Sequence, residues 1–154
     1  MLDQIEEVLK KSKTIAMIGV SSIKKKEDPK NLKRKPSTIV MKYMQDFGYK
    51  VIPVNPFAIG EVIYGETVVG NLKEISIPVD IVNVFRPSNE TPVFAKEAVN
   101  IGAKTLWLQY GIQHEESKNI AENSNMHYFQ NLCIKQEYQR IFQKMSPVFP
   151  VLRS

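Results

Sequence analysis

The chain has 154 residues, of which 43% are hydrophobic and 24% charged, and its formal net charge is +5. A chain of this length buries roughly two-thirds of its unfolded surface, so we expect one domain over 1–154, with a core at about 12–143 and a tail at 145–154. No apolar run reaches the ~18 residues of a membrane span, and the acidic start is unlike a secretory signal; we therefore expect a cytoplasmic protein without membrane contact. Cys133 is the single cysteine, which excludes an intramolecular disulfide and a zinc site built from cysteines.

Helical and strand patterns alternate along the chain. Apolar residues recur at helical spacing over 2–11, and the apolar run 14–18 then predicts a buried strand. A helix over about 37–47 ends at Gly48, where a terminating glycine is expected. The remaining patterns predict strands at 50–54, 80–85, 104–109 and 126–129, and a weaker extended stretch at 62–64. They also predict helices at 71–75, 114–123 and about 133–143, and one more helix that is capped by 88–90 and ends at Gly102.

Apolar strands joined by helices predict an α/β fold with a doubly wound parallel β-sheet in a three-layer α/β/α arrangement. In such sheets, ligands bind at the carboxyl ends of the strands, near the point where the strand order reverses. The turns that follow the predicted strands at that edge are 19–22, 55–56, 85–87 and 109–111.

These turns indicate a ligand with phosphate groups. Gly19 follows the first strand and precedes Ser21 and Ser22, a pattern typical of a phosphate-binding turn. An NAD site requires three glycines there and a carboxylate after the second strand, whereas this chain has one glycine and a neutral Asn55. Arg86 adds a guanidinium that pairs with phosphates or stacks on a base. A ligand with several phosphates is favoured over NAD, and NADP or ATP remains an alternative.

The combination of five segments resembles the small stand-alone CoA-binding proteins, which are relatives of the CoA-binding domain of succinyl-CoA synthetase α subunits. The resemblance spans about residues 12 to 140, and the segments that carry it are 18–21, 48–56, 79–86, 102–111 and 133–137. It implies a Rossmann-like fold that holds coenzyme A. The implied contact residues are Gly19, Ser21 and Ser22 for the diphosphate; Asn55, Pro56 and Arg86 for the adenosine end; Gln109 and Gly111 for the pantetheine; and Val20, Phe85 and Pro87 beside them.

The segment before the second helix departs from the family pattern. Seven basic residues crowd into 24–35, where relatives have a shorter segment with one arginine–proline pair. Pro36 and Ser37 match that pattern, and the role of the loop arginine falls to Lys33, Arg34 or Lys35, of which Lys35 is directly adjacent. The basic segment is interpreted either as a phosphate clamp, which a ligand orders as a lid, or as a solvated loop.

No catalytic residue or metal site is assigned. The synthetases need a phosphorylated histidine in a second domain and a partner subunit, and the histidines here, His114 and His127, are interpreted as a surface residue in a first helical turn and a strand residue. Cys133 is interpreted as a packing residue or as a thiol at a helix start that forms a mixed disulfide with the coenzyme. Trp107 is expected in the core.

Three functions follow from this reading. The favoured one is a non-catalytic carrier or sensor of coenzyme A or acyl-CoA. The second is a subunit of a CoA-linked ligase or transferase that acts only with a partner, and a protein partner or a homodimer stays open. The third, a nucleic-acid module using the lysines of 24–35, is disfavoured because no aromatic residues are interleaved with them.

Overall fold

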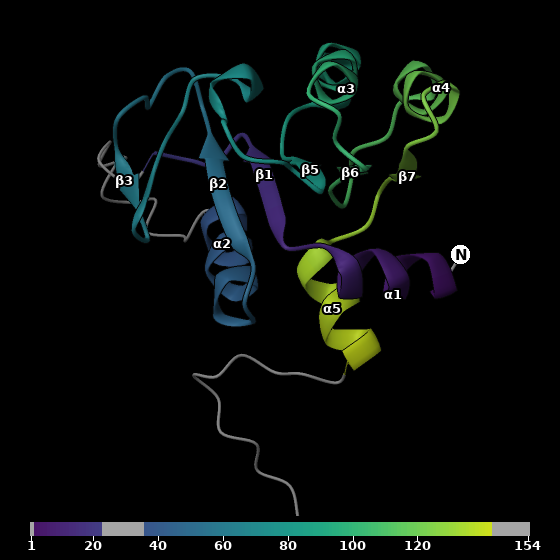
Figure 1. The fold of residues 1–154 in the computed structure, drawn as a ribbon, viewed down its shortest axis with the longest axis horizontal. Coiled ribbons are helices and arrows are strands. Elements are labelled where there is room, and N and C mark those ends of the chain that lie inside the picture. The colour runs from purple at the N-terminus through teal and green to yellow at the C-terminus, as the bar shows by residue number, and fades with distance from the viewer. Residues whose placement is uncertain (1, 23–35, 143–154) are drawn as a thin grey trace, which may run out of the picture.

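A parallel sheet forms the centre of the molecule, in a computed structural model that describes residues 2–22 and 36–142. Its strands run in the order β2-β1-β5-β6-β7, and each neighbouring pair is parallel (Figure 1). The bounds are β1 Thr14–Ile18, β2 Lys50–Val54, β5 Ile81–Val84, β6 Thr105–Leu108 and β7 His127–Phe129. This sheet confirms the predicted α/β fold with a doubly wound parallel arrangement.

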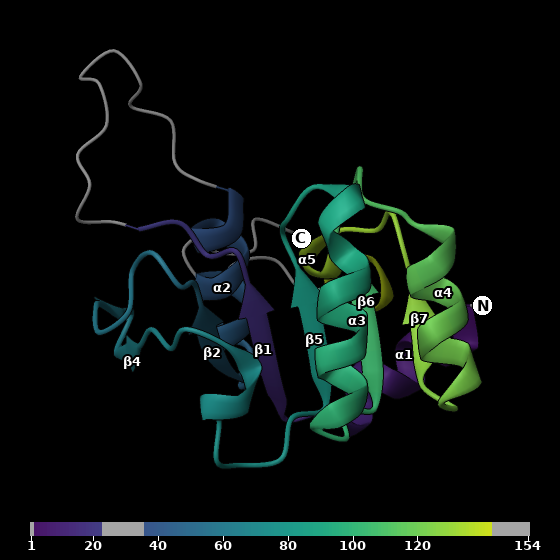
Figure 2. The same ribbon diagram turned by 90° about the horizontal axis from the view of Figure 1, so that it is seen from above.

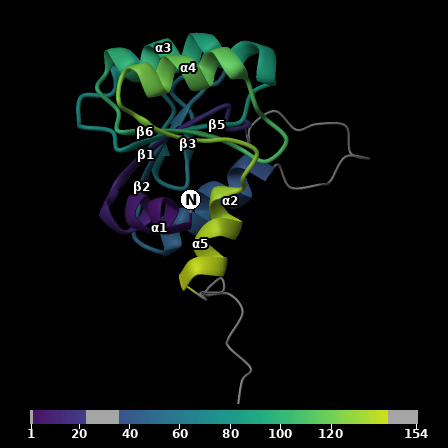
Figure 3. The same ribbon diagram turned by 90° about the vertical axis from the view of Figure 1, so that its right-hand side faces the viewer.

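Helices cover both faces of the sheet and make the three predicted layers (Figure 3). One face is covered by α1, α2 and α5, and the other by α3 and α4, which also pack against each other (Figure 2). The bounds are α1 Leu2–Lys11, α2 Pro36–Asp46, α3 Thr91–Asn100, α4 Glu115–Asn123 and α5 Ile134–Phe142. None of the helices in 2–22 and 36–142 combines the length and the apolar character needed to cross a bilayer.

Successive strand residues face opposite helical layers, which is why the strands are apolar throughout. In β1, Ile15 and Met17 pack toward α1, α2 and α5, whereas Ala16 and Ile18 pack toward α3 and α4. Trp107 is fully buried in β6, as expected, and its Nε1 donates to the Leu132 carbonyl oxygen at 2.8 Å. That bond ties β6 to the segment that leads into α5.

A small hairpin extends the chain beside β2. Strands β3 (Val62–Ile63) and β4 (Glu66–Thr67) pair antiparallel around Tyr64 and Gly65, which both have positive φ, as a two-residue hairpin turn requires. The sequence patterns predicted only an extended stretch at 62–64, because β4 is short and polar and carries no strand signal. Two 3₁₀ turns, η1 Leu72–Glu74 and η2 Ser88–Glu90, complete the described elements.

Several predicted boundaries differ from the structure. β5 begins after Asp80, whose carboxylate accepts the N–H groups of Lys13 (2.7 Å) and Thr14 (3.0 Å). Residues 88–90 do not cap α3 with a side chain; they form η2, and the hydroxyl of Thr91 donates to the Ser88 carbonyl oxygen at 2.8 Å. His114 is the N-cap of α4 instead of a residue in its first turn. The predictions for 24–35 and 145–154 fall outside the described residues.

Candidate functional site

The reversal of strand order lies between β1 and β5. From β1 the chain crosses through α2 to β2 on one side, and from β5 it crosses through α3 to β6 on the other. The ends of the two strands are joined, because the Phe85 N–H donates to the Ile18 carbonyl oxygen at 2.8 Å. The turns after β1, β2, β5 and β6 therefore meet at one edge, where ligands of such sheets bind.

Gly19 allows the turns after β1 and β5 to touch. Its φ is +91°, and a Cβ built there lies 2.6 Å from the Phe85 carbonyl oxygen and 3.0 Å from the Arg86 Cδ. A side chain at this position meets protein backbone, so close packing of the two turns is by itself a sufficient reason for glycine. The predicted approach of a diphosphate to the same turn stays a prediction.

The serines after Gly19 hold the first turn to its neighbours. Ser21 donates its N–H to the Ser37 hydroxyl at 3.0 Å, which connects the turn to the first turn of α2. Ser22 donates its hydroxyl to the Glu61 carboxylate at 2.6 Å. Of these serines, Ser21 lines a cavity at the sheet edge, whereas Ser22 and the buried Ser37 are not among the lining residues.

Asn55 joins the turns after β1 and β2. Its Nδ2 donates to the Val20 carbonyl oxygen at 2.8 Å, and its Oδ1 accepts the Phe57 N–H at 2.8 Å in a local Asx turn around Pro56. The Val20 side chain is fully buried in the core, so this residue contributes its carbonyl and not a contact surface. Asn55 and Pro56 still line the edge of the sheet.

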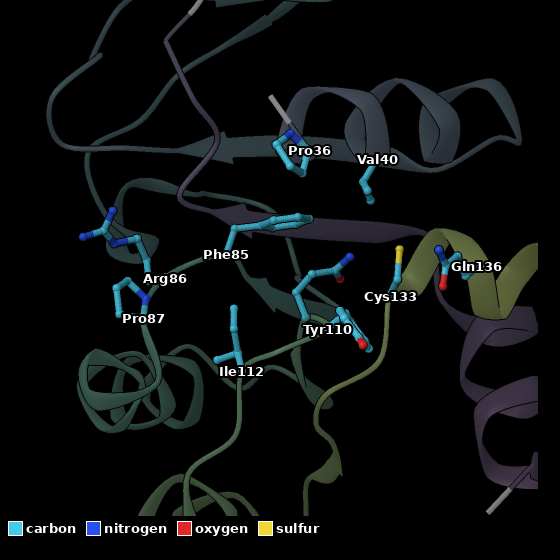
Figure 4. A pocket seen from close by; sticks show the side chains of 10 residues that line it. Pro36, Val40, Phe85, Arg86, Pro87, Tyr110, Ile112, Cys133 and Gln136 are labelled. Carbon is cyan, nitrogen blue, oxygen red and sulfur yellow. The ribbon is translucent and has the colours of Figure 1, made fainter. Parts of the chain in front are cut away.

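Two cavities open at this edge, one on each side of Arg86. The smaller, of about 340 Å³, is lined by Ile18, Gly19, Ser21, Val54, Asn55, Pro56, Phe57, Gly70, Asn71, Arg86, Glu90, Phe94 and Glu97. The larger, of about 840 Å³, is lined by Pro36, Val40, Phe85, Arg86, Pro87, Gln109, Tyr110, Ile112, Cys133 and Gln136 (Figure 4). Arg86 lines both.

Arg86 is held by a carboxylate. Its Nε and one terminal nitrogen each donate to Glu90 at 2.9 Å, in a bidentate pair whose side chains are 44% and 40% exposed. The hydrogen bonds with Glu90 raise the pKa of Arg86, and the same bonds lower the pKa of Glu90. A pair this exposed contributes on the order of 0.2–1 kcal/mol, so a ligand phosphate can replace the carboxylate at the guanidinium.

Gln109 stands at the carboxyl end of β6 with 6% of its surface exposed. Its Oε1 accepts the N–H of Ile134 and the Nδ2 of Asn83, both at 3.3 Å. Since a backbone N–H only donates, the Ile134 bond sets the orientation of the amide. The Nε2 group has no hydrogen-bond partner in 2–22 and 36–142, and Gln109 lines the larger cavity.

The structure separates the remaining predicted residues. Pro36, Phe85 and Pro87 line the larger cavity, whereas Gly111 lies outside it and donates its N–H to the Asn131 Oδ1 at 2.7 Å. Lys35 lies outside the described residues.

Several of the residues that line the two cavities were not predicted from the sequence. The missed residues are Val40, Ile112 and Gln136 in the larger cavity, and Phe57, Gly70, Asn71, Glu90, Phe94 and Glu97 in the smaller. A usable signal existed for Val40 alone, because it follows Pro36 by one helical turn.

The histidines lie outside both cavities. His114 uses its Nδ1 to accept the Glu116 N–H at 3.2 Å, a capping contact at the start of α4. His127 is an exposed residue of β7 whose ring stacks with Phe129. Within 2–22 and 36–142, no three His, Cys, Asp or Glu side chains group closely enough to hold a metal ion.

The fold and this edge define a parallel α/β protein with a candidate ligand site where the strand order reverses. A family model for the CoA binding domain matches residues 13–139, and the chain belongs to that family. The resemblance read from the sequence is therefore confirmed.

Relatives agree in sequence and structure. The uncharacterized protein YneT of Bacillus subtilis (strain 168) is 40% identical over 132 residues, which cover 86% of this chain and 90% of that protein. A Thermus thermophilus structure, cell-free ID.343, has a TM-score of 0.80 and 31% identity, with 92% of this chain and 99% of that chain covered. A hypothetical protein of Pyrococcus horikoshii OT3 has a TM-score of 0.81 and 27% identity, with 92% of each chain covered.

Proposed function

We propose that this protein binds coenzyme A or an acyl-CoA at the carboxyl edge of its sheet and acts as a carrier or sensor without catalysing a reaction. The observation that carries the proposal is the position of Arg86, which lines two cavities of different chemistry. Coenzyme A has the same two parts, a phosphorylated nucleotide and a largely aliphatic arm with two amides. Membership of the CoA binding domain family supports the assignment.

The larger cavity suits the pantetheine arm. Much of its wall is apolar, with Pro36, Val40, Phe85 and Ile112 among the lining residues. The Nε2 of Gln109, which has no hydrogen-bond partner among residues 2–22 and 36–142, supplies a donor for an amide or thioester carbonyl. Aliphatic groups and amide groups of the arm thus each meet a matching surface.

The smaller cavity suits the nucleotide. It combines the Gly19 turn, the Ser21 segment, Asn55 and the Arg86 guanidinium. NAD fits less well, because β2 ends at the neutral Asn55, whose side-chain amide is already used on both sides by the Val20 carbonyl oxygen and the Phe57 N–H. ATP lacks a group that fills the apolar cavity beyond Arg86.

Calorimetric titration with coenzyme A, acetyl-CoA, NAD and ATP, each at two salt concentrations, tests the proposal. We expect coenzyme A or acetyl-CoA to bind most tightly. Arg86→Ala removes a charged hydrogen-bond donor, a change of about 1.5–3 kcal/mol, so we expect affinity to fall by roughly tenfold or more. Arg140→Ala is the matched control, because Arg140 pairs with Glu137 on α5 and lies outside both cavities.

The outcomes separate the alternatives. Tighter binding of NAD or ATP than of coenzyme A contradicts the proposal, and so does a complete lack of binding. Binding of coenzyme A that Arg86→Ala and Arg140→Ala weaken equally contradicts the placement of the phosphates. Turnover that starts only when a second chain is added identifies a partner-dependent ligase or transferase subunit.

A further inference from the structure

A thiol lines the part of the larger cavity that is far from Arg86. Cys133 is the last residue before α5; it is partly buried, lines the cavity and is the only cysteine of the chain. In Figure 4, Arg86 stands at one end of the cavity, Cys133 and Gln136 lie toward the other, and Phe85 is between them. A ligand that places its phosphates at Arg86 and its arm along Phe85 therefore directs the end of the arm to Cys133.

A second observation, independent of the cysteine, points to a ligand in the same place. Gln109 is 6% exposed, and its Oε1 is occupied by the Ile134 N–H, the first amide of α5. Its Nε2 has no partner among the residues that the structure describes, although Gln109 lines the cavity that also contains Cys133. An amide donor in a cavity wall that has no protein partner is available to a ligand, and an arm with carbonyl groups supplies an acceptor in the cavity that Cys133 also lines.

We propose that Cys133 is the site at which the protein captures coenzyme A covalently, by thiol–disulfide exchange with a CoA disulfide. This inference rests on the proposed binding of coenzyme A at the same edge. The Cys133 thiolate attacks the sulfur on the bound CoA half of CoA–S–S–R, the new Cys133–S–S–CoA bond forms, and RS⁻ leaves. Cys133 gives its proton to solvent, and no further oxidant is needed because the disulfide itself accepts the electron pair.

The surroundings of Cys133 suit this exchange better than a packing role alone. Tyr110, at the same cavity, is 74% exposed, so the cavity opens to solvent and gives the leaving thiolate a way out. Cys133 immediately precedes α5 (Ile134–Phe142), so the start of that helix lies at the same cavity as the thiol. Cys133 packs against the core on one side and faces the cavity on the other, and a packing role does not require the second contact.

Intact-mass spectrometry of the protein incubated with CoA disulfide tests the proposal. We expect a mass increase of one coenzyme A less two hydrogens, which a reducing agent reverses. Glutathione disulfide is the reference reagent, and we expect CoA disulfide to react at least tenfold faster. Cys133→Ser should give no adduct with either disulfide, because it removes the attacking sulfur.

A further variant distinguishes directed capture from simple thiol reactivity. Arg86→Ala should slow the reaction with CoA disulfide by at least fivefold and leave the reaction with glutathione disulfide unchanged. Equal rates for the two disulfides overturn the proposal, as does the absence of an adduct in a protein that calorimetry shows to bind coenzyme A; both leave the proposed function intact. If calorimetry shows no binding of coenzyme A, the proposed function fails and this inference fails with it.

Discussion

The contact between the turns after β1 and β5 predicts that Gly19→Ala is one of the costliest small substitutions at the site. Two effects add. An L-residue in a left-handed conformation costs roughly 1–2 kcal/mol. The new Cβ also lies 2.6 Å from the Phe85 carbonyl oxygen, so the end of β5 must shift, at a cost of about 1–3 kcal/mol. We expect the free energy of unfolding to fall by roughly 2–5 kcal/mol.

Gly60→Ala separates the two effects. Gly60 has a φ of +89°, against +91° for Gly19, but a Cβ built there has no atom within 4 Å. It carries only the conformational cost of roughly 1–2 kcal/mol. Urea unfolding of both variants at one pH gives the two free energies and shows from the slopes whether the denatured state has changed. Equal losses of stability refute the claim that the turns after β1 and β5 are in close contact.

Two further predictions concern Gln109 and Tyr128. Gln109→Glu keeps the oxygen that accepts the Ile134 N–H but removes the Nε2 donor, so we expect the affinity for coenzyme A to fall by roughly tenfold. Gln113→Glu is the control, because Gln113 lies outside both cavities and its substitution should change the affinity little. Equal effects of the two substitutions in calorimetry contradict the role of the donor. Burial raises the pKa of Tyr128 to about 12, above the ~10 of an unfolded tyrosine, so the folded state binds this proton more tightly and loses stability as the pH rises from 10 to 12. Thermal melts should show a smaller loss of stability between pH 10 and 12 for Tyr128→Phe than for the wild type. An equal loss in the two proteins contradicts the assignment of this pH dependence to Tyr128.

The candidate site divides into a part that local sequence indicates and a part that it does not. Gly19, Asn55, Arg86 and Gln109 each follow an apolar strand, and parallel strands bring their carboxyl ends to one edge, so pattern alone indicated that they meet. Pattern did not reveal that Glu90 already holds Arg86, because an exposed pair at i and i+4 in a turn looks like many surface pairs. Nor did it show that both faces of the Asn55 amide are occupied.

By itself, the sequence determined the fold class, the order of the main strands and helices, and the family. These properties follow from the spacing of hydrophobic residues, from the glycines that end helices and from the short segments at strand ends. All three signals are local along the chain. Long elements such as α2 shifted by only about one residue, whereas β4 was missed because a two-residue polar strand is too short to show a period.

Tertiary structure alone decided the chemistry of the edge. Gly19 is required either to admit a ligand or to make room for the Phe85 carbonyl oxygen. Which of the two applies depends on how two segments 66 positions apart in the chain lie in space. The Nε2 of Gln109 has no partner among residues 2–22 and 36–142, and Gln109 lines the same cavity as Cys133; both facts depend on α5 starting next to the end of β6. Hydrogen-bond partners of this kind are set by where the backbone of another element lies in space, and no pattern within one segment records that position.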